Sequence, residues 1–141
     1  MNNIKILICT FFGMLGSFFA KLFGGWSADM TTLLIFMVID FVMGVLIALV
    51  FKKSPKTENG ALDSHSCFRG LCKKCAILLF ILVSHRLDIS LGTEYIKTTT
   101  IIAFIVNEAI SIIENSALMG MPLPDSIKNA IELLKRKKND A

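Results

Sequence analysis

Long and nearly uncharged apolar runs limit what this chain can fold into. Four of them stand out, at residues 4–23, 30–51, 75–95 and 98–119. A helix needs about 20 mostly apolar residues to cross a bilayer. Only helices and closed barrels satisfy their backbone groups there, and these runs are too long and continuous for barrel strands. We therefore predict an all-α integral membrane protein with about four transmembrane helices, joined by a loop at 52–74 and followed by a tail at 120–141.

Composition agrees with this class. The chain has 141 residues, of which 54% are hydrophobic and 18% are charged, whereas an ordinary soluble domain has about 25% charged residues. The apolar runs leave no space for a separate soluble catalytic domain. We expect a membrane protein that is not an enzyme.

The first run allows two other interpretations. Lys5 before an apolar core is also typical of a signal peptide, but no small-x-small cleavage pattern follows it cleanly. Alternatively, residues 4–23 form a helix that lies at the membrane interface, with Lys21 and Trp26 at the level of the headgroups.

Basic residues predict the orientation. Of the 15 Lys and Arg residues, six lie in the loop 52–74, five lie in the tail 120–141, and Lys5 precedes the first run. All of these fall on one side if four helices span, and the positive-inside rule then places both termini in the cytoplasm. The tail is either a short solvated helix or a basic amphipathic helix on anionic headgroups, and we favour contact with lipid. Its membrane-surface residues are Lys135, Arg136, Lys137 and Lys138.

The fourth run carries polar residues where a membrane helix should be apolar. At about 100° per residue, five other polar residues fall within about 60° of Ser111 on either side, and the six together form a polar wedge. The wedge consists of Thr100, Asn107, Glu108, Ser111, Glu114 and Asn115. Such a wedge must face protein or water, because a charge at mid-depth in lipid costs about 2.5–3.5 kcal/mol. It either packs between helices or lines an aqueous path, and we favour the path.

Small residues near Asp40 indicate close helix packing. Gly44 and Ala48 follow Asp40 at spacings of four, and Gly13 and Ser17 make a similar ridge in the first run. Small residues at this spacing allow two helices to approach. Packing alone leaves Asp40 unexplained, and we expect a partner helix to bond it.

Two other clusters suggest chemistry less strongly. Ser84, His85 and Asp88 include the residue types of a hydrolase, but adjacent residues on a helix point in different directions, and an ion pair of Arg86 with a carboxylate is the better interpretation. A weak zinc-site candidate also precedes the third run. Its residues are His65, Cys67, Cys72 and Cys75. The spacing is tighter than in usual zinc pairs, and reduced cytoplasmic thiols are the simpler interpretation.

Several motifs together resemble a known family. They are D-x-x-x-G at Asp40 to Gly44, R-G-L-x-K-K at Arg69 to Lys74, N-E-A-I-S-I-I-E-N at Asn107 to Asn115, and G-M-P-L-P at Gly120 to Pro124. With these motifs, the chain resembles the bacteriophage-type holins, in particular the clostridial toxin-secretion (TcdE-like) holins. The resemblance extends from about Ile35 to the C-terminus.

The resemblance implies a small protein of the bacterial cytoplasmic membrane that associates with itself. Such proteins open lesions through which an endolysin or a large toxin leaves the cell. The resemblance implies no catalysis, no cofactor and no nucleic-acid partner. Two alternatives remain open, a small-solute or ion transport component and a non-enzymatic scaffold subunit, since both would share the polar wedge and Asp40.

Overall fold

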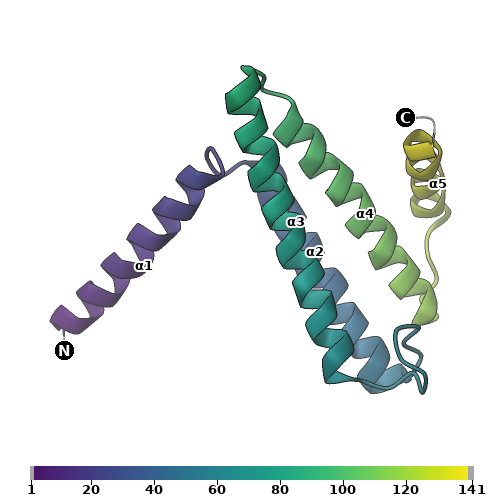
Figure 1. Ribbon diagram of the computed structural model, residues 1–141. Helices are drawn as coiled ribbons and strands as arrows, with labels where there is room; N and C mark the ends of the chain where they lie inside the picture. The colour runs from purple at the N-terminus through teal and green to yellow at the C-terminus, as the bar shows by residue number, and fades with distance from the viewer. Residues whose placement is uncertain (1, 140–141) are drawn as a thin grey trace.

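Helices make up all the regular structure of the described residues. The computed structural model describes residues 2–139, and at residues 131, 134, 135 and 137–139 it describes the backbone only. In chain order the elements are α1 (Asn2–Leu22), α2 (Ala28–Leu46), the π-helical turn η1 (Ile47–Phe51), α3 (Ser64–Leu91), α4 (Ile96–Leu118) and α5 (Asp125–Asn139) (Figure 1).

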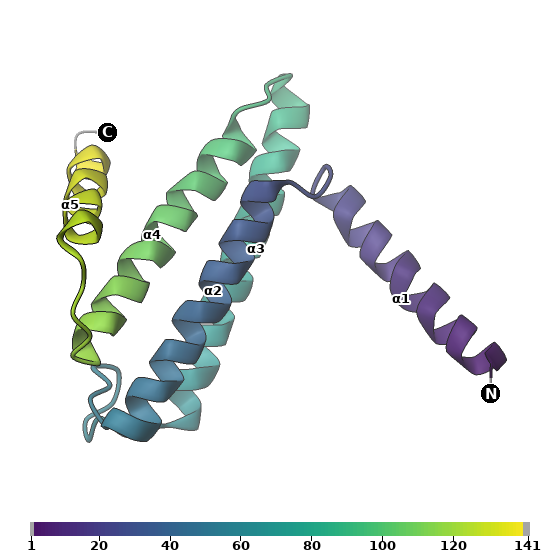
Figure 2. The same cartoon turned by 180° about the vertical axis from the view of Figure 1, so that it is seen from behind.

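Three of these helices form an antiparallel bundle. α2, α3 and α4 run side by side along most of their lengths, whereas α1 points away from them (Figures 1 and 2). The turns 23–27 and 92–95 lie at one end of the bundle, here called the turn end. The loop 52–63 lies at the other, here called the loop end. After α4, the chain passes Gly120 and two prolines, reverses direction and continues as α5.

Local signals set the helix boundaries. Ser27 caps α2 by accepting a hydrogen bond from the Met30 N–H (3.2 Å), and Asp63 caps α3 by accepting one from the Ser66 N–H (3.0 Å). Gly92 ends α3 with φ +67°, a conformation that favours glycine. α3 therefore begins at Ser64, well before the predicted residue 75, because the Asp63 cap starts the helix inside the segment that we predicted to be a loop.

A dry core fills the turn end of the bundle. Five buried side chains form it: Met30, Leu33, Met37, Ile81 and Ile101. Phe104 of α4 packs against this cluster, and its ring lies 6.5 Å from that of Phe80 between centroids. Each of the three helices contributes to the core, which therefore fixes their relative positions.

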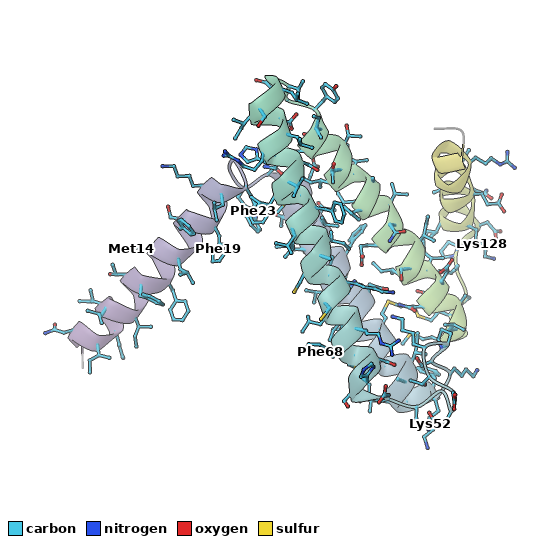
Figure 3. All side chains as sticks on the ribbon, viewed as in Figure 1. Met14, Phe19, Phe23, Lys52, Phe68 and Lys128 are labelled. Carbon is cyan, nitrogen blue, oxygen red and sulfur yellow. The ribbon has the colours of Figure 1, made fainter. Side chains whose placement is uncertain are left out.

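One joint attaches α1 to the bundle. No residue of α1 is buried, but Phe23, just after it, packs against the core (Figure 3). The Lys97 ammonium donates to the carbonyl oxygens of Phe23 and Gly25. Gly24 has φ +70°, and a Cβ there would lie 2.1 Å from the His85 ring, so the joint requires glycine.

Three described helices are long and apolar enough to cross a membrane. They are α1, α2 with η1 (Ala28–Phe51), and α4. α3 has 28 residues, about 42 Å at 1.5 Å per residue, but charged residues interrupt its apolar sequence. The chain is thus an all-helical protein with three membrane-spanning candidates, and a fourth span stays a prediction.

Candidate functional site

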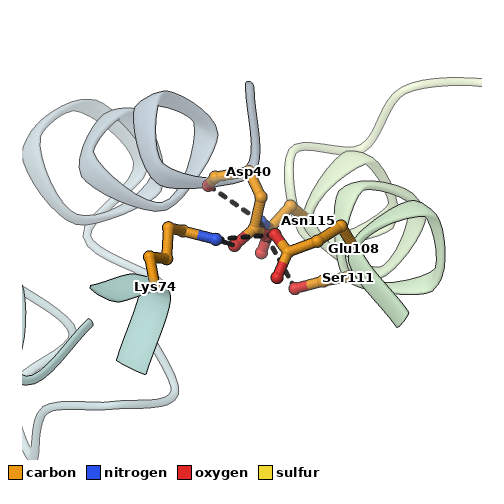
Figure 4. Close-up of polar contacts among 5 residues, drawn as sticks. All are labelled: Asp40, Lys74, Glu108, Ser111 and Asn115. Carbon is orange, nitrogen blue, oxygen red and sulfur yellow. Dashed lines mark hydrogen bonds and ion pairs between the residues drawn. The ribbon is translucent and has the colours of Figure 1, made fainter. Parts of the chain in front are cut away.

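Three charged side chains meet inside the bundle, one from each helix. The Lys74 ammonium of α3 lies 2.8 Å from Asp40 Oδ2 of α2 and 2.6 Å from Glu108 Oε2 of α4 (Figure 4). Lys74 therefore bridges two carboxylates that belong to different helices. We call these three residues, with Ser111 and Asn115, the ion cluster.

Two polar residues of α4 complete the ion cluster. Ser111 Oγ donates to Asp40 Oδ1 (2.6 Å), and Asn115 Nδ2 donates to the same oxygen (2.9 Å). Asn115 also reaches the Asp40 backbone carbonyl (3.4 Å). No buried side-chain nitrogen or oxygen in the described part of the chain lacks a partner. The polar groups are thus satisfied within one chain, as buried polar networks require.

Burial makes the ion cluster sensitive to its charge balance. The side chains of Lys74, Asp40 and Glu108 are 13%, 11% and 5% exposed. Removing a charge from water costs several kcal/mol, and a good ion pair offsets that cost only while both partners are present. Asp40 and Glu108 also lie near the middle of their helices, where an unpaired charge would be most costly in a bilayer.

A cavity of about 470 Å³ adjoins the ion cluster on its loop-end side. Asp40, Glu108 and Lys74 line its inner part, and residues of the loop 54–63 line its outer part. At roughly 30 Å³ per molecule, it is large enough for about ten or more waters. The polar half of the bundle is therefore hollow, whereas the apolar half is filled.

A seven-residue spacing aligns these groups. On each helix, buried and half-buried residues recur at alternating steps of three and four, as in a coiled coil. On α3 the stripe is Cys67, Gly70, Lys74, Ile77, Ile81, Ser84 and Asp88. On α4 it is Ile101, Phe104, Glu108, Ser111, Asn115 and Leu118. Lys74 was missed as a site residue, and its place in this stripe was the signal that could have found it.

Comparison with known proteins assigns the family. A sequence model of the bacteriophage holin family matches residues 17–136. The chain belongs to the bacteriophage holin family. Since that is a family of membrane proteins rather than enzymes, the match agrees with the apolar helices in making this chain a holin-type membrane protein.

Relatives of this holin occur in several bacteria. An uncharacterized 14.9 kDa protein of Clostridium perfringens is 38% identical over 140 residues, which cover 98% of this chain and 100% of the relative. An uncharacterized protein of Listeria innocua is 35% identical over 126 residues, which cover 89% of this chain and 84% of the relative. YqxH of Bacillus subtilis, also uncharacterized, is 30% identical, with 85% and 80% covered. No solved structure matches the chain.

The six residues of the polar wedge fall into two groups, one inside the bundle and one on its surface. Glu108, Ser111 and Asn115 belong to the ion cluster, and Thr100 turns inward at the turn end, where its hydroxyl lies 2.9 Å from that of Ser84. Asn107 and Glu114 are exposed on the flank of α4. The structure thus brings four of the six residues into the bundle, and the pore-lining role stays a prediction.

The predicted packing ridges have different surroundings. Asp40 is bonded by a partner helix, as its position suggested, and Ala48 is buried. A Cβ at Gly44 would meet nothing within 4 Å, because Gly44 borders the cavity. Gly13 and Ser17 lie on α1, which buries no residue against the rest of the described chain. A packing role for these two requires another chain and stays a prediction.

The less specific clusters do not assemble. Ser84 donates to the Phe80 carbonyl, and Asp88 accepts from the N–H groups of Ile96 and Lys97, so Ser84 and Asp88 have separate structural partners. Arg86 forms no ion pair among the described residues, which contradicts our interpretation. Asp88, two residues along the chain, instead accepts hydrogen bonds from N–H groups at the start of α4.

The weak zinc candidate is not gathered around a common point. No three His, Cys, Asp or Glu side chains of the described residues are placed to hold a metal. His65 Nδ1 instead accepts from Arg69 Nη2 (3.0 Å), and all four cysteines are free thiols.

The predicted membrane-surface residues lie on α5. Arg136 is exposed, and the side chains of Lys135, Lys137 and Lys138 lie outside the described residues. Lipid contact by this helix stays a prediction.

Proposed function

We propose that this holin-family protein assembles with copies of itself in the bacterial cytoplasmic membrane and opens lesions through which an endolysin or a toxin leaves the cell. The observation that carries this proposal is the ion cluster. It places two carboxylates and a lysine at mid-helix in a chain whose helices expose many large apolar side chains. A protein that only had to remain in lipid would avoid this cost.

The ion cluster supports a protein with a silent and an open state. Within one subunit, Glu108, Ser111 and Asn115 bond to Lys74 and Asp40 and are hidden from lipid. In a large ring, the same stripe of α4 would face water, which can replace each of those bonds. Asn107 and Glu114, already exposed beside the stripe, would widen the polar surface.

We also propose that α3 spans the membrane as the fourth helix. It runs antiparallel to α2 and α4, and its polar residues Lys74, Ser84 and Asp88 are at least partly buried in the bundle. Part of its low hydropathy therefore arises on the face that lipid would not contact, and the exposed Arg69, Lys73 and Arg86 lie toward its two ends. With four spans, the basic loop and tail share one side, and the positive-inside rule places them in the cytoplasm.

Release from liposomes tests the proposed function. Purified protein is reconstituted with a small dye and a folded protein, both encapsulated. Release of both is the expected result for a lesion-forming holin. Release of the dye alone would favour the transport alternative or a narrow channel, and release of neither by inserted protein would favour a scaffold subunit.

A pair of variants tests the role of the polar wedge. We expect Asn107→Leu to insert normally but to lose most release, because Asn107 is exposed and its loss breaks no bond within the subunit. Ile102→Leu, on the opposite face of α4 and also exposed, is the matched control and should release like the wild type. Equal release by both variants would contradict a pore-lining wedge. Glu108→Leu should also abolish release, although it additionally removes the bond to Lys74.

A further inference from the structure

We propose that the cavity beside the ion cluster is an aqueous vestibule that enters the bundle from the loop end only, and that Lys74 is the latch that closes its inner end. The proposal rests on the proposed holin function for its biological role, because release of Lys74 would be the step at which water first reaches the polar wedge. The vestibule itself belongs to the single, closed subunit.

The polar part of the cavity wall suits water. Its inner part carries charged and amide groups, Asp40, Glu108 and Asn115, and its outer part carries Thr57 and Asp63 of the loop end. Gly44 and Gly70 also line the cavity, and the absence of side chains at both leaves space open. Apolar side chains such as Val45 and Ile47 form the rest of the wall, but a cavity of this size with several bonding partners is expected to be hydrated.

The turn end of the bundle closes the vestibule. One step along each helix from the ion cluster, the stripe becomes apolar, with Met37 on α2, Ile77 and Ile81 on α3, and Phe104 on α4. Met37 and Ile81 are 5% and 0% exposed. Water that reaches Asp40 from the loop end therefore meets a filled core and can go no further.

Lys74 holds the inner end together. Among the interactions of the described residues, its ion pair with Asp40 is the polar side-chain contact that joins α3 to α2. Without the ammonium, Asp40 and Glu108 would be two carboxylates on the same cavity with no cation between them, and both would demand water. Release of Lys74 would therefore hydrate the polar stripe of α4 and free the loop-end half of α3 from α2.

Cysteine labelling tests the vestibule. The four native cysteines are replaced by serine, and a single cysteine is placed at Gly44 in the cavity or at Met37 in the dry core. A Cβ at Gly44 meets nothing within 4 Å, so the cysteine fits. Asn59→Cys at the loop end and Glu94→Cys at the turn end, both exposed, report which side a charged, membrane-impermeant thiol reagent reaches.

The labelling is read in vesicles that still retain an encapsulated dye. We expect Gly44→Cys to react from the side on which Asn59→Cys reacts, and Met37→Cys to react from neither side. Reaction of Gly44→Cys from neither side, or equally from both, would overturn the vestibule. Because these vesicles are intact, this result stands whether or not the protein later releases a folded cargo.

The latch is tested in the same vesicles. We expect Lys74→Met to raise the labelling rate of Gly44→Cys about tenfold, because two unpaired carboxylates draw water inward. With Lys74→Arg, the cysteine at Gly44 should label at the wild-type rate. With the neutral combination Asp40→Asn, Lys74→Met and Glu108→Gln, its labelling rate should return close to the wild-type rate. An unchanged rate with Lys74→Met would overturn the latch. If Lys74→Met does not insert, Lys74→Gln takes its place with the same expected outcomes.

Discussion

The two ends of the bundle use the same helices and the same seven-residue spacing, yet different forces hold them together. At the turn end, Leu33, Ile81 and their neighbours fill the interior completely. At the loop end, Asp40, Lys74 and Glu108 occupy equivalent positions beside a cavity of about 470 Å³. Packing holds the first end whatever its ionic state, whereas the second end stays closed only while its charges balance. We infer that the turn end is the fixed part of the fold and the loop end is the part that can change.

The largest effect should come from removing the charge of Lys74. We expect Lys74→Met to destabilise the protein by about 3–5 kcal/mol, because breaking a buried ion pair leaves uncompensated charge inside. The neutral combination Asp40→Asn, Lys74→Met and Glu108→Gln should recover most of this loss, since no buried charge remains. Denaturation in mixed detergent micelles, followed by helix content, measures both. A combination no more stable than Lys74→Met alone would show that the shape of Lys74, not its charge, matters.

A smaller effect should follow a matched truncation at the turn end. We expect Leu33→Ala to cost about 2 kcal/mol, the low end of the range for a buried leucine, because lipid rather than water surrounds the bundle. The same denaturation experiment measures it. Labelling of a cysteine at Gly44 should not change, since the cavity lies beyond the ion cluster. Faster labelling in Leu33→Ala would mean that the two ends are not independent.

Much of the helical plan could be predicted from hydropathy, and the need of Asp40 for a partner followed from its depth alone. Lys74 was harder to place, because two adjacent lysines before an apolar run are typical of a membrane boundary. The stripe from Cys67 to Asp88 contained the contrary signal, since a helix that begins at Ser64 turns Lys74 inward. The residue at which α3 begins therefore decides whether Lys74 marks the membrane boundary or lies inside the bundle.

The position of α1 could not be predicted in the same way. The ridge of Gly13 and Ser17 indicated a packing face without indicating what covers it, and α1 buries none of its residues. Its attachment depends on Lys97 and His85, which lie far away in the sequence and reach the turn after Phe23. Sequence patterns report periodic faces, but not contacts between a backbone carbonyl and a distant side chain.

The smallest effect should come from Asp63, which caps α3 at the entrance of the vestibule, at the loop end. Asp63 is exposed, and the hydrogen bond from the Ser66 N–H lowers the pKa of its carboxyl below the ordinary 3.8. A group with a lowered folded pKa stabilises the fold above its unfolded pKa and loses that contribution as the pH falls through the folded pKa. Asp63→Ala should therefore lower the thermal midpoint slightly at pH 7, but not at a pH well below 3.8. Asp63→Asn keeps an oxygen that can cap α3 without titrating, and should show no such pH dependence.

Thermal melts in micelles at both pH values make the comparison. A deficit in Asp63→Ala that persists in acid would assign the cap to the shape of the side chain, and the loop end would then owe its sensitivity to the ion cluster alone.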